Sequence, residues 1–147
     1  MIITFCGHSN FVGSEEYKNK TFALLNKLVG DEPVIFYLGN YGGFDKFAFS
    51  CCRSFKETHP NSTLVFVTPY RDQKYLAHHL PVDDEYDEIL YPDIENKPLR
   101  FAISYRNKYM VEKADVVIAY IDHSFGGAYK TYEYAQKKEK TIYNIFE

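Results

Sequence analysis

The chain contains no tryptophan, only three cysteines and no long apolar run. The last two features limit the classes of protein to which it can belong. The cysteine count is odd and Cys51 is adjacent to Cys52, which does not fit a disulfide framework and indicates a reducing, cytoplasmic location. No apolar stretch approaches the roughly 20 residues that a membrane-spanning helix needs. The first residues lack the charged and cleavable segments of a signal peptide and are typical of a strand. We therefore expect a cytoplasmic globular protein with no membrane partner.

Basic tracts are absent as well. The longest run of lysine or arginine is the pair Lys137-Lys138, and the formal net charge is −3. A protein that binds the phosphate backbone of a polynucleotide normally presents a basic face. The composition therefore predicts that nucleic acid is not a partner.

Two nucleotide-binding fingerprints are also missing. No G-x-G-x-x-G follows the first apolar run, and no G-x-x-x-x-G-K-[ST] occurs anywhere in the chain. These absences argue against a dinucleotide-dependent dehydrogenase and against a P-loop NTPase.

What the chain does contain is a regular alternation of short apolar runs with amphipathic stretches, which is typical of a parallel α/β sheet. Its 147 residues suit a single domain, 1–147. Strands are expected at 2–6, 34–38, 63–68, 88–91, 116–121 and 141–145, and helices at 15–29, 44–58, 71–79, 100–113 and 128–138. The predicted fold is a three-layer α/β sandwich, in which a mostly parallel sheet of about six strands carries helices on both faces. The acidic segment 80–87 is expected to be a solvated loop.

The most informative segment lies near the C-terminus, where an apolar strand leads into Gly126-Gly127 and then a helix. Adjacent glycines at such a junction let backbone N–H groups approach a ligand at the positive end of the helix dipole, an arrangement that suits a phosphate. Glu133 follows about two turns into the helix and adds a carboxylate that phosphate binding does not require.

Three further strand ends carry glycine or polar residues. In open α/β sheets, ligands bind at the carboxyl ends of the strands, near a topological switch point. Several such ends on one sheet edge therefore predict a ligand site there. The residues that we expect to contact a ligand at this edge are Gly7, His8, Ser9, Gly39, Gly42, Gly43, Asp45, Thr68, Pro69, Tyr70, Asp122, His123, Gly126, Gly127, Ala128 and Thr131.

Arg106 is the cationic candidate for this site. It lies three residues after Ile103 and four before Met110, so it shares their apolar helix face. An arginine on a buried face needs an anionic partner. Spacing leaves two alternatives open: a structural ion pair with Asp115 or Glu133, or a bidentate contact with a ligand phosphate.

The histidines are ambiguous. His8 and His123 fall on strand-end loops, where either can contact a ligand or act as an acid or base. With Asp122 they form a conceivable metal site, but nothing in the sequence has the spacing of a ligand pair, so we expect no metal and no cofactor. Cys6 ends a buried strand and has no base paired with it in the sequence.

A family resemblance is carried by Phe5-Cys6-Gly7-His8-Ser9, by the helix around Arg106, and by Gly126-Gly127 with Glu133. These segments resemble the SLOG superfamily, a Rossmann-like group named for the DprA/Smf and Lonely Guy (LOG) proteins. The resemblance covers nearly the whole chain and is strongest to a small bacterial and phage branch related to YpsA. It implies a Rossmann-like fold and a nucleotide-related ligand.

The Lonely Guy enzymes are phosphoribohydrolases with the motif P-G-G-x-G-T-x-x-E and an arginine on the preceding helix. By this resemblance Glu133 and Arg106 are the catalytic and ligand-binding candidates of an N-glycosidic-bond hydrolase. The chain departs from the motif at Phe125, Tyr129 and Lys130, and Thr131 comes one position late.

Other members of the superfamily are similar in fold and sense nucleotide-derived signals such as ADP-ribose derivatives. Because the enzyme loop is altered, the resemblance favours binding or sequestration of a nucleotide-derived signal, in a phage or defence setting. Hydrolysis of a nucleoside monophosphate is the alternative, and a non-catalytic protein-interaction module is a further one. Related enzymes are commonly dimers, which implies a homo-oligomer.

Overall fold

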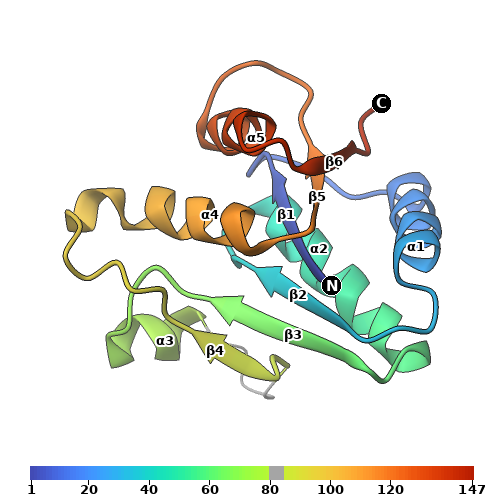
Figure 1. The fold of residues 1–147 in the computed structure, drawn as a ribbon, viewed down its shortest axis with the longest axis horizontal. Helices are drawn as coiled ribbons and strands as arrows, with labels where there is room; N and C mark the ends of the chain where they lie inside the picture. Colours follow the sequence, from blue (N-terminus) through green and yellow to red (C-terminus); the bar gives the residue numbers. More distant parts are fainter. Residues whose placement is uncertain (80–84) are drawn as a thin grey trace.

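The computed structural model describes residues 1–79 and 85–147, and Figure 1 shows its elements in chain order. The elements are β1 (Ile2–Gly7), α1 (Glu15–Val29), β2 (Val34–Leu38), α2 (Gly43–Thr58), β3 (Ser62–Val67), α3 (Gln73–His79), β4 (Glu88–Leu90), a 3-10 turn (Leu99–Phe101), α4 (Ala102–Lys113), β5 (Val116–Tyr120), α5 (Gly127–Lys137) and β6 (Thr141–Asn144).

One parallel sheet contains these strands in the order β4-β3-β2-β1-β5-β6. The chain moves outward from β1 to β4 and then crosses back to add β5 and β6 on the other side of β1. The strand order therefore reverses between β1 and β5, which is the topological switch point of the sheet.

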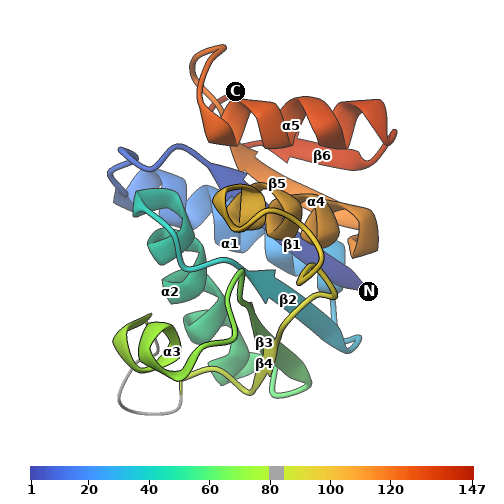
Figure 2. The ribbon, with the colours of Figure 1, turned by 90° about the vertical axis from the view of Figure 1, so that its left-hand side faces the viewer.

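Side chains that alternate along the strands divide the core into two layers. Ile3 and Phe5 of β1 pack with α1 and α2, whereas Cys6 packs with α4 and α5 on the other face. The helices α4 and α5 lie next to each other on their face (Figure 2). Both faces of the sheet are thus covered, as a parallel sheet requires.

Helix ends follow local chemistry. Ser14 accepts a hydrogen bond from the backbone N–H of Tyr17 and caps α1, which carries Glu15 and Glu16 in its first turn. Asp72 accepts one from the N–H of Tyr75 at the start of α3. By contrast, α2 and α5 begin at glycines and have no side-chain cap.

The predicted α/β three-layer fold is confirmed, and the sheet is fully parallel. Most boundaries agree to within two residues, and the helix expected at 100–113 begins instead with the 3-10 turn. The loop expected at 80–87 lies largely outside the described residues. Within the described parts of the chain, no helix has the length and apolar character needed to cross a membrane.

Candidate functional site

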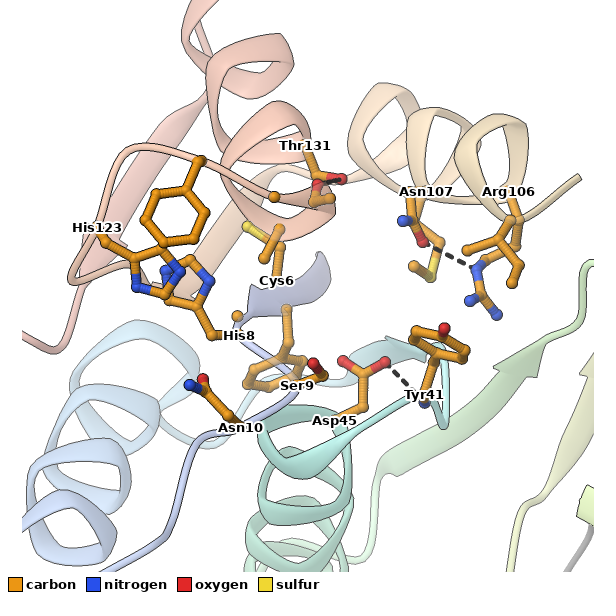
Figure 3. Close-up of a pocket in the computed structure, with 18 residues that line it drawn as sticks. Cys6, His8, Ser9, Asn10, Tyr41, Asp45, Arg106, Asn107, His123 and Thr131 are labelled. Atoms are coloured by element: carbon orange, nitrogen blue, oxygen red, sulfur yellow. Dashed lines mark hydrogen bonds between the residues drawn. The ribbon is translucent and has the colours of Figure 1, made fainter. Parts of the chain in front are cut away.

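A cavity of about 540 Å³ opens at the switch point of the sheet, between the loops that follow β1, β2 and β5 (Figure 3). A volume of this size is in the range of small-molecule sites. The residues that line it are Phe5, Cys6, Gly7, His8, Ser9, Asn10, Tyr41, Asp45, Ile103, Arg106, Asn107, Met110, His123, Phe125, Gly126, Gly127, Ala128 and Thr131.

The N-terminus of α5 forms one wall of the cavity. Gly126 has φ 93°, a backbone conformation that favours glycine, and no side chain caps the helix. A Cβ added at Gly126 or Gly127 would meet nothing within 4 Å. Both glycines line the cavity, so the uncapped first turn of α5 places the positive end of the helix dipole at the cavity.

The second glycine pair, Gly42-Gly43, has a different role. A Cβ at Gly43 would come within 2.3 Å of the backbone oxygen of Phe11, and one at Gly42 within 2.6 Å of the Ser9 Cβ. The N–H of Gly43 donates a hydrogen bond to the backbone oxygen of Ser9 at 2.8 Å. This pair lets the β2–α2 loop pack closely against the loop after β1, and neither glycine lines the cavity.

Arg106 is buried and still reaches the cavity. Its Nη1 donates to the backbone oxygens of Gly39 and Val67, at 2.9 and 2.8 Å, and its Nε donates to Oδ1 of Asn107 at 2.9 Å. Of the two structural partners expected for it, Asp115 instead accepts from the N–H of Ile2 and Glu133 is exposed.

Asp45 supplies the negative charge that Arg106 faces. Its Oδ2 accepts a hydrogen bond from the N–H of Tyr41 at 2.9 Å. Burial raises the pKa of Asp45 to about 6, against the opposing effects of the Arg106 charge and of that hydrogen bond. Asp45 is the one carboxylate among the described residues that line the cavity.

Two exposed aromatic rings stand at the rim. Tyr41 follows β2 and is 56% exposed, and Phe125 follows β5 and is 70% exposed. Rings so exposed at the mouth of a cavity offer stacking surfaces for a planar ligand group.

His8, Asp122 and His123 form a cluster at one end of the cavity. The imidazole rings of His8 and His123 stack with centroids 3.5 Å apart, and Asp122 Oδ1 lies 2.5 Å from His123 Nδ1. In Figure 3, His8 and His123 lie on the left of the cavity, and Arg106 and Asn107 lie on the right. Burial is the main cause that lowers the pKa of His8, and the charge of the neighbouring His123 lowers it further.

Cys6 also lines the cavity but is not an activated thiol. Burial, and next the charge of Asp45, raise its pKa to about 12. A thiol that remains protonated is a poor nucleophile.

Many of the expected site residues line the cavity together: Gly7, His8, Ser9, Asp45, Arg106, His123, Gly126, Gly127, Ala128 and Thr131. Others do not: Gly39, Gly42, Gly43, Thr68, Pro69, Tyr70, Asp122 and Glu133. Gly39 and Asp122 instead hold lining residues in place, through hydrogen bonds to Arg106 and His123.

Thr68, Pro69 and Tyr70 follow β3, which is separated from β1 by β2. The Thr68 hydroxyl donates a hydrogen bond to the backbone oxygen of Tyr70 and closes a local turn. Glu133 lies two residues after Thr131 and therefore about 200° around α5, away from the cavity.

Eight lining residues were not among those predicted from the sequence: Phe5, Cys6, Asn10, Tyr41, Ile103, Asn107, Met110 and Phe125. Ile103 and Met110 had a usable signal, because they share the helix face of Arg106. Of the others, Phe5, Cys6 and Asn107 belong to β1 and α4, and the rest lie on loops. Their places at the cavity depend on the tertiary fold.

Sheet order and site position define a Rossmann-like α/β protein with its cavity at the switch point. The chain is similar to two solved structures of DNA processing protein A (DprA). The Helicobacter pylori structure matches with a TM-score of 0.67 and 19% identity, over 97% of this chain and 63% of that one. The Streptococcus pneumoniae structure matches with a TM-score of 0.62 and 15% identity, over 95% and 48%. This chain thus spans less than two thirds of either protein, and the likeness concerns the fold.

Among curated proteins, the chain is 26% identical over 137 residues to YoqJ of Bacillus subtilis (strain 168), an uncharacterized SPbeta prophage-derived protein. The match covers 82% of this chain and 80% of YoqJ. No family model matches the sequence.

These comparisons correct one prediction. The composition excluded a nucleic acid partner, yet the Helicobacter pylori protein with the same fold has a single-stranded DNA binding mode. The exclusion was therefore wrong, because net charge describes the whole surface and a ligand meets only one site.

Proposed function

We propose that the chain binds a nucleotide-derived small molecule, such as a nucleoside phosphate or an ADP-ribose-type signal, as a sensor or sequestering protein of the SLOG type. The observation that carries the proposal is the uncapped N-terminus of α5, whose Gly126-Gly127 backbone opens onto the cavity. Such a terminus binds phosphate through its N–H groups and the helix dipole.

The remaining walls complement the other parts of a nucleotide. Tyr41 and Phe125 offer exposed rings for a base, and Asp45 and Asn107 offer hydrogen-bonding groups for ribose hydroxyls. Arg106 adds a buried positive charge. A prophage relative is consistent with sequestration of a signal in a phage setting.

Binding is a better proposal than glycosidic hydrolysis. The hydrolase reading requires Glu133 to contact the reacting bond, and Glu133 is exposed and does not line the cavity. Asp45 does line it, but its Oδ2 accepts from the backbone of Tyr41 and its charge faces Arg106.

Single-stranded DNA is a second candidate ligand, favoured by the fold shared with the Helicobacter pylori protein. Exposed aromatic rings also stack nucleobases of single strands. Binding of this kind depends strongly on salt, because it releases counterions from many phosphates.

The test is thermal shift and calorimetry with ADP-ribose, AMP and a labelled oligothymidylate. At a hundredfold excess over Kd, a ligand of the folded state adds about 2.7 kcal/mol, or roughly 5–10 °C for a chain of this size. Gly127→Val fills the space beside the α5 N-terminus, so we expect it to abolish the shift while changing stability by no more than about 1 kcal/mol.

Glu133→Gln is the matched control, because it changes an exposed residue of the same helix. No shift with any nucleotide, or an equal shift in Gly127→Val, contradicts the proposal. Salt-sensitive binding of the oligonucleotide alone would replace it with the DNA reading. Release of free adenine from AMP that is lost in Glu133→Gln would restore the hydrolase.

A further inference from the structure

The cluster of His8, Asp122 and His123 contains a buried imidazole nitrogen to which the described residues offer no hydrogen bond. The side chain of His8 is only 5% exposed, and its Nε2 makes no hydrogen bond within the described protein. Asp122 Oδ1 lies 3.5 Å from this nitrogen, without hydrogen-bond geometry. An unsatisfied buried polar atom of this kind is costly and calls for an explanation.

Other side-chain atoms that can bind a metal ion lie close to this nitrogen. One ligand atom from each of His8, Asp122 and His123 lies within 4.8 Å of the other two. Two imidazoles and one carboxylate are a donor set that Zn²⁺ and related transition metals prefer.

We propose that His8, Asp122 and His123 bind one divalent transition-metal ion, with Zn²⁺ as the reference cation, at the wall of the cavity. The cation occupies the space beside His8 Nε2 and gives that atom the bond that the described residues do not supply.

A rotation of the His123 side chain converts the cluster into a coordination site. Bonds of about 2.0–2.2 Å from each ligand place two donors roughly 3–4 Å apart, close to the 3.5 Å between His8 Nε2 and Asp122 Oδ1. Asp122 and His123 are closer, at 2.5 Å, so metal binding replaces their hydrogen bond by two metal bonds. His123 must also tilt out of its stack on His8, which its loop position and its 28% exposed side chain allow.

The site has open coordination positions. Three protein ligands leave at least one position for water or an external oxygen, as in catalytic and ligand-binding zinc sites rather than in closed structural ones. His8 and His123 both line the cavity, so that position faces the space beside the α5 N-terminus. The proposal does not depend on nucleotide binding, although a ligand phosphate would be a suitable additional donor.

The experiment is titration of the metal-free protein with Zn²⁺ by calorimetry, without nucleotide, together with the visible absorption of Co²⁺ as a report on ligand type and geometry. We expect one Zn²⁺ per chain. His8→Gln and His123→Gln are each expected to weaken binding by about tenfold or more, and to alter the Co²⁺ spectrum.

His59→Gln is the matched control, because His59 stacks on Phe55 and its Nδ1 already has hydrogen-bond partners. It should leave Zn²⁺ affinity unchanged. Circular dichroism checks that each variant folds, and His123→Gln on the loop remains informative if His8→Gln does not. Absent binding, or affinity unchanged in His123→Gln, overturns the metal site. Nucleotide binding measured with EDTA present then tests the proposed function separately.

Discussion

At the scale of single residues, Asp45 sets the electrostatics of the cavity. It faces Arg106, and burial holds its pKa near 6, well above the ordinary value of a carboxyl. A group with this pKa changes its charge just below neutral pH, so the charge presented to an anionic ligand depends on pH.

We therefore expect ADP-ribose to bind more tightly as the pH falls from 8 through about 6. Protonation removes the negative charge of Asp45, and one charge removed near an anion is worth roughly tenfold in Kd. Asp45→Asn should bind tightly across the whole range. Calorimetry between pH 5.5 and 8 measures both proteins, and ADP-ribose is chosen because its doubly esterified pyrophosphate does not titrate there.

The same shift has a consequence for stability. The folded-state pKa of Asp45 is raised, so its contribution is favourable at low pH and is lost as the pH rises through about 6. Asp45→Asn should accordingly raise the Tm at pH 8 more than at pH 5.

For the affinity prediction, a pH profile of ADP-ribose binding that keeps its full slope in Asp45→Asn would show that another group is responsible.

At the scale of elements, the two Gly-Gly pairs have different structural roles in their two loops. Gly42-Gly43 lets two loops pack backbone against backbone, whereas Gly126-Gly127 leaves open space beside a helix start. The sequence predicted ligand contact for both pairs, because each pair stands between a strand and a helix.

Gly43→Ala should destabilise the protein by about 2–4 kcal/mol, because its Cβ would overlap the backbone oxygens of Phe11 and Ser9. Gly127→Ala is the control, since its Cβ meets no atom within 4 Å, and should stay within about 1 kcal/mol of the parent. Urea unfolding followed by circular dichroism gives both values. Equal stability of the two variants would show that the β2–α2 loop relaxes around the added methyl group.

At the scale of the whole molecule, Arg106 connects the helix layer that contains α4 to the sheet. It extends from α4 to the carboxyl ends of β2 and β3, where it binds the backbone oxygens of Gly39 and Val67. Burial lowers its pKa, and the negative charge of Asp45 opposes that effect. The residue therefore supports the floor of the cavity as well as lining it.

Arg106→Ala is expected to cost about 3–5 kcal/mol, because it leaves buried oxygens unsatisfied and Asp45 without its counter-charge. Arg100→Ala serves as the control, since Arg100 is exposed. Urea unfolding at pH 7 measures both. A loss below about 1 kcal/mol for Arg106→Ala would mean that water replaces the guanidinium in the folded state.

Part of the candidate site was predictable because its signals are local. Gly126-Gly127, His8 and Arg106 stand out from their neighbours in the chain, and all of them line the cavity. Helical periodicity was also enough to predict that Glu133 does not face the cavity. It lies about 200° from Thr131 around α5, and therefore on the side of the helix opposite to Thr131. The family resemblance assigned a site role to Glu133 from its spacing to Gly126-Gly127, which takes no account of the helix face.

The sequence by itself determined the elements and the fold class, because apolar periodicity and turn residues act over a few neighbouring positions. The tertiary structure alone decided the order of the strands, and therefore which loops meet. That order separates Thr68 and Tyr70 from the cavity and brings His8 against Asp122 and His123, more than 110 positions away in the chain. Contacts of this kind arise only when β5 pairs with β1, and no local pattern records that pairing.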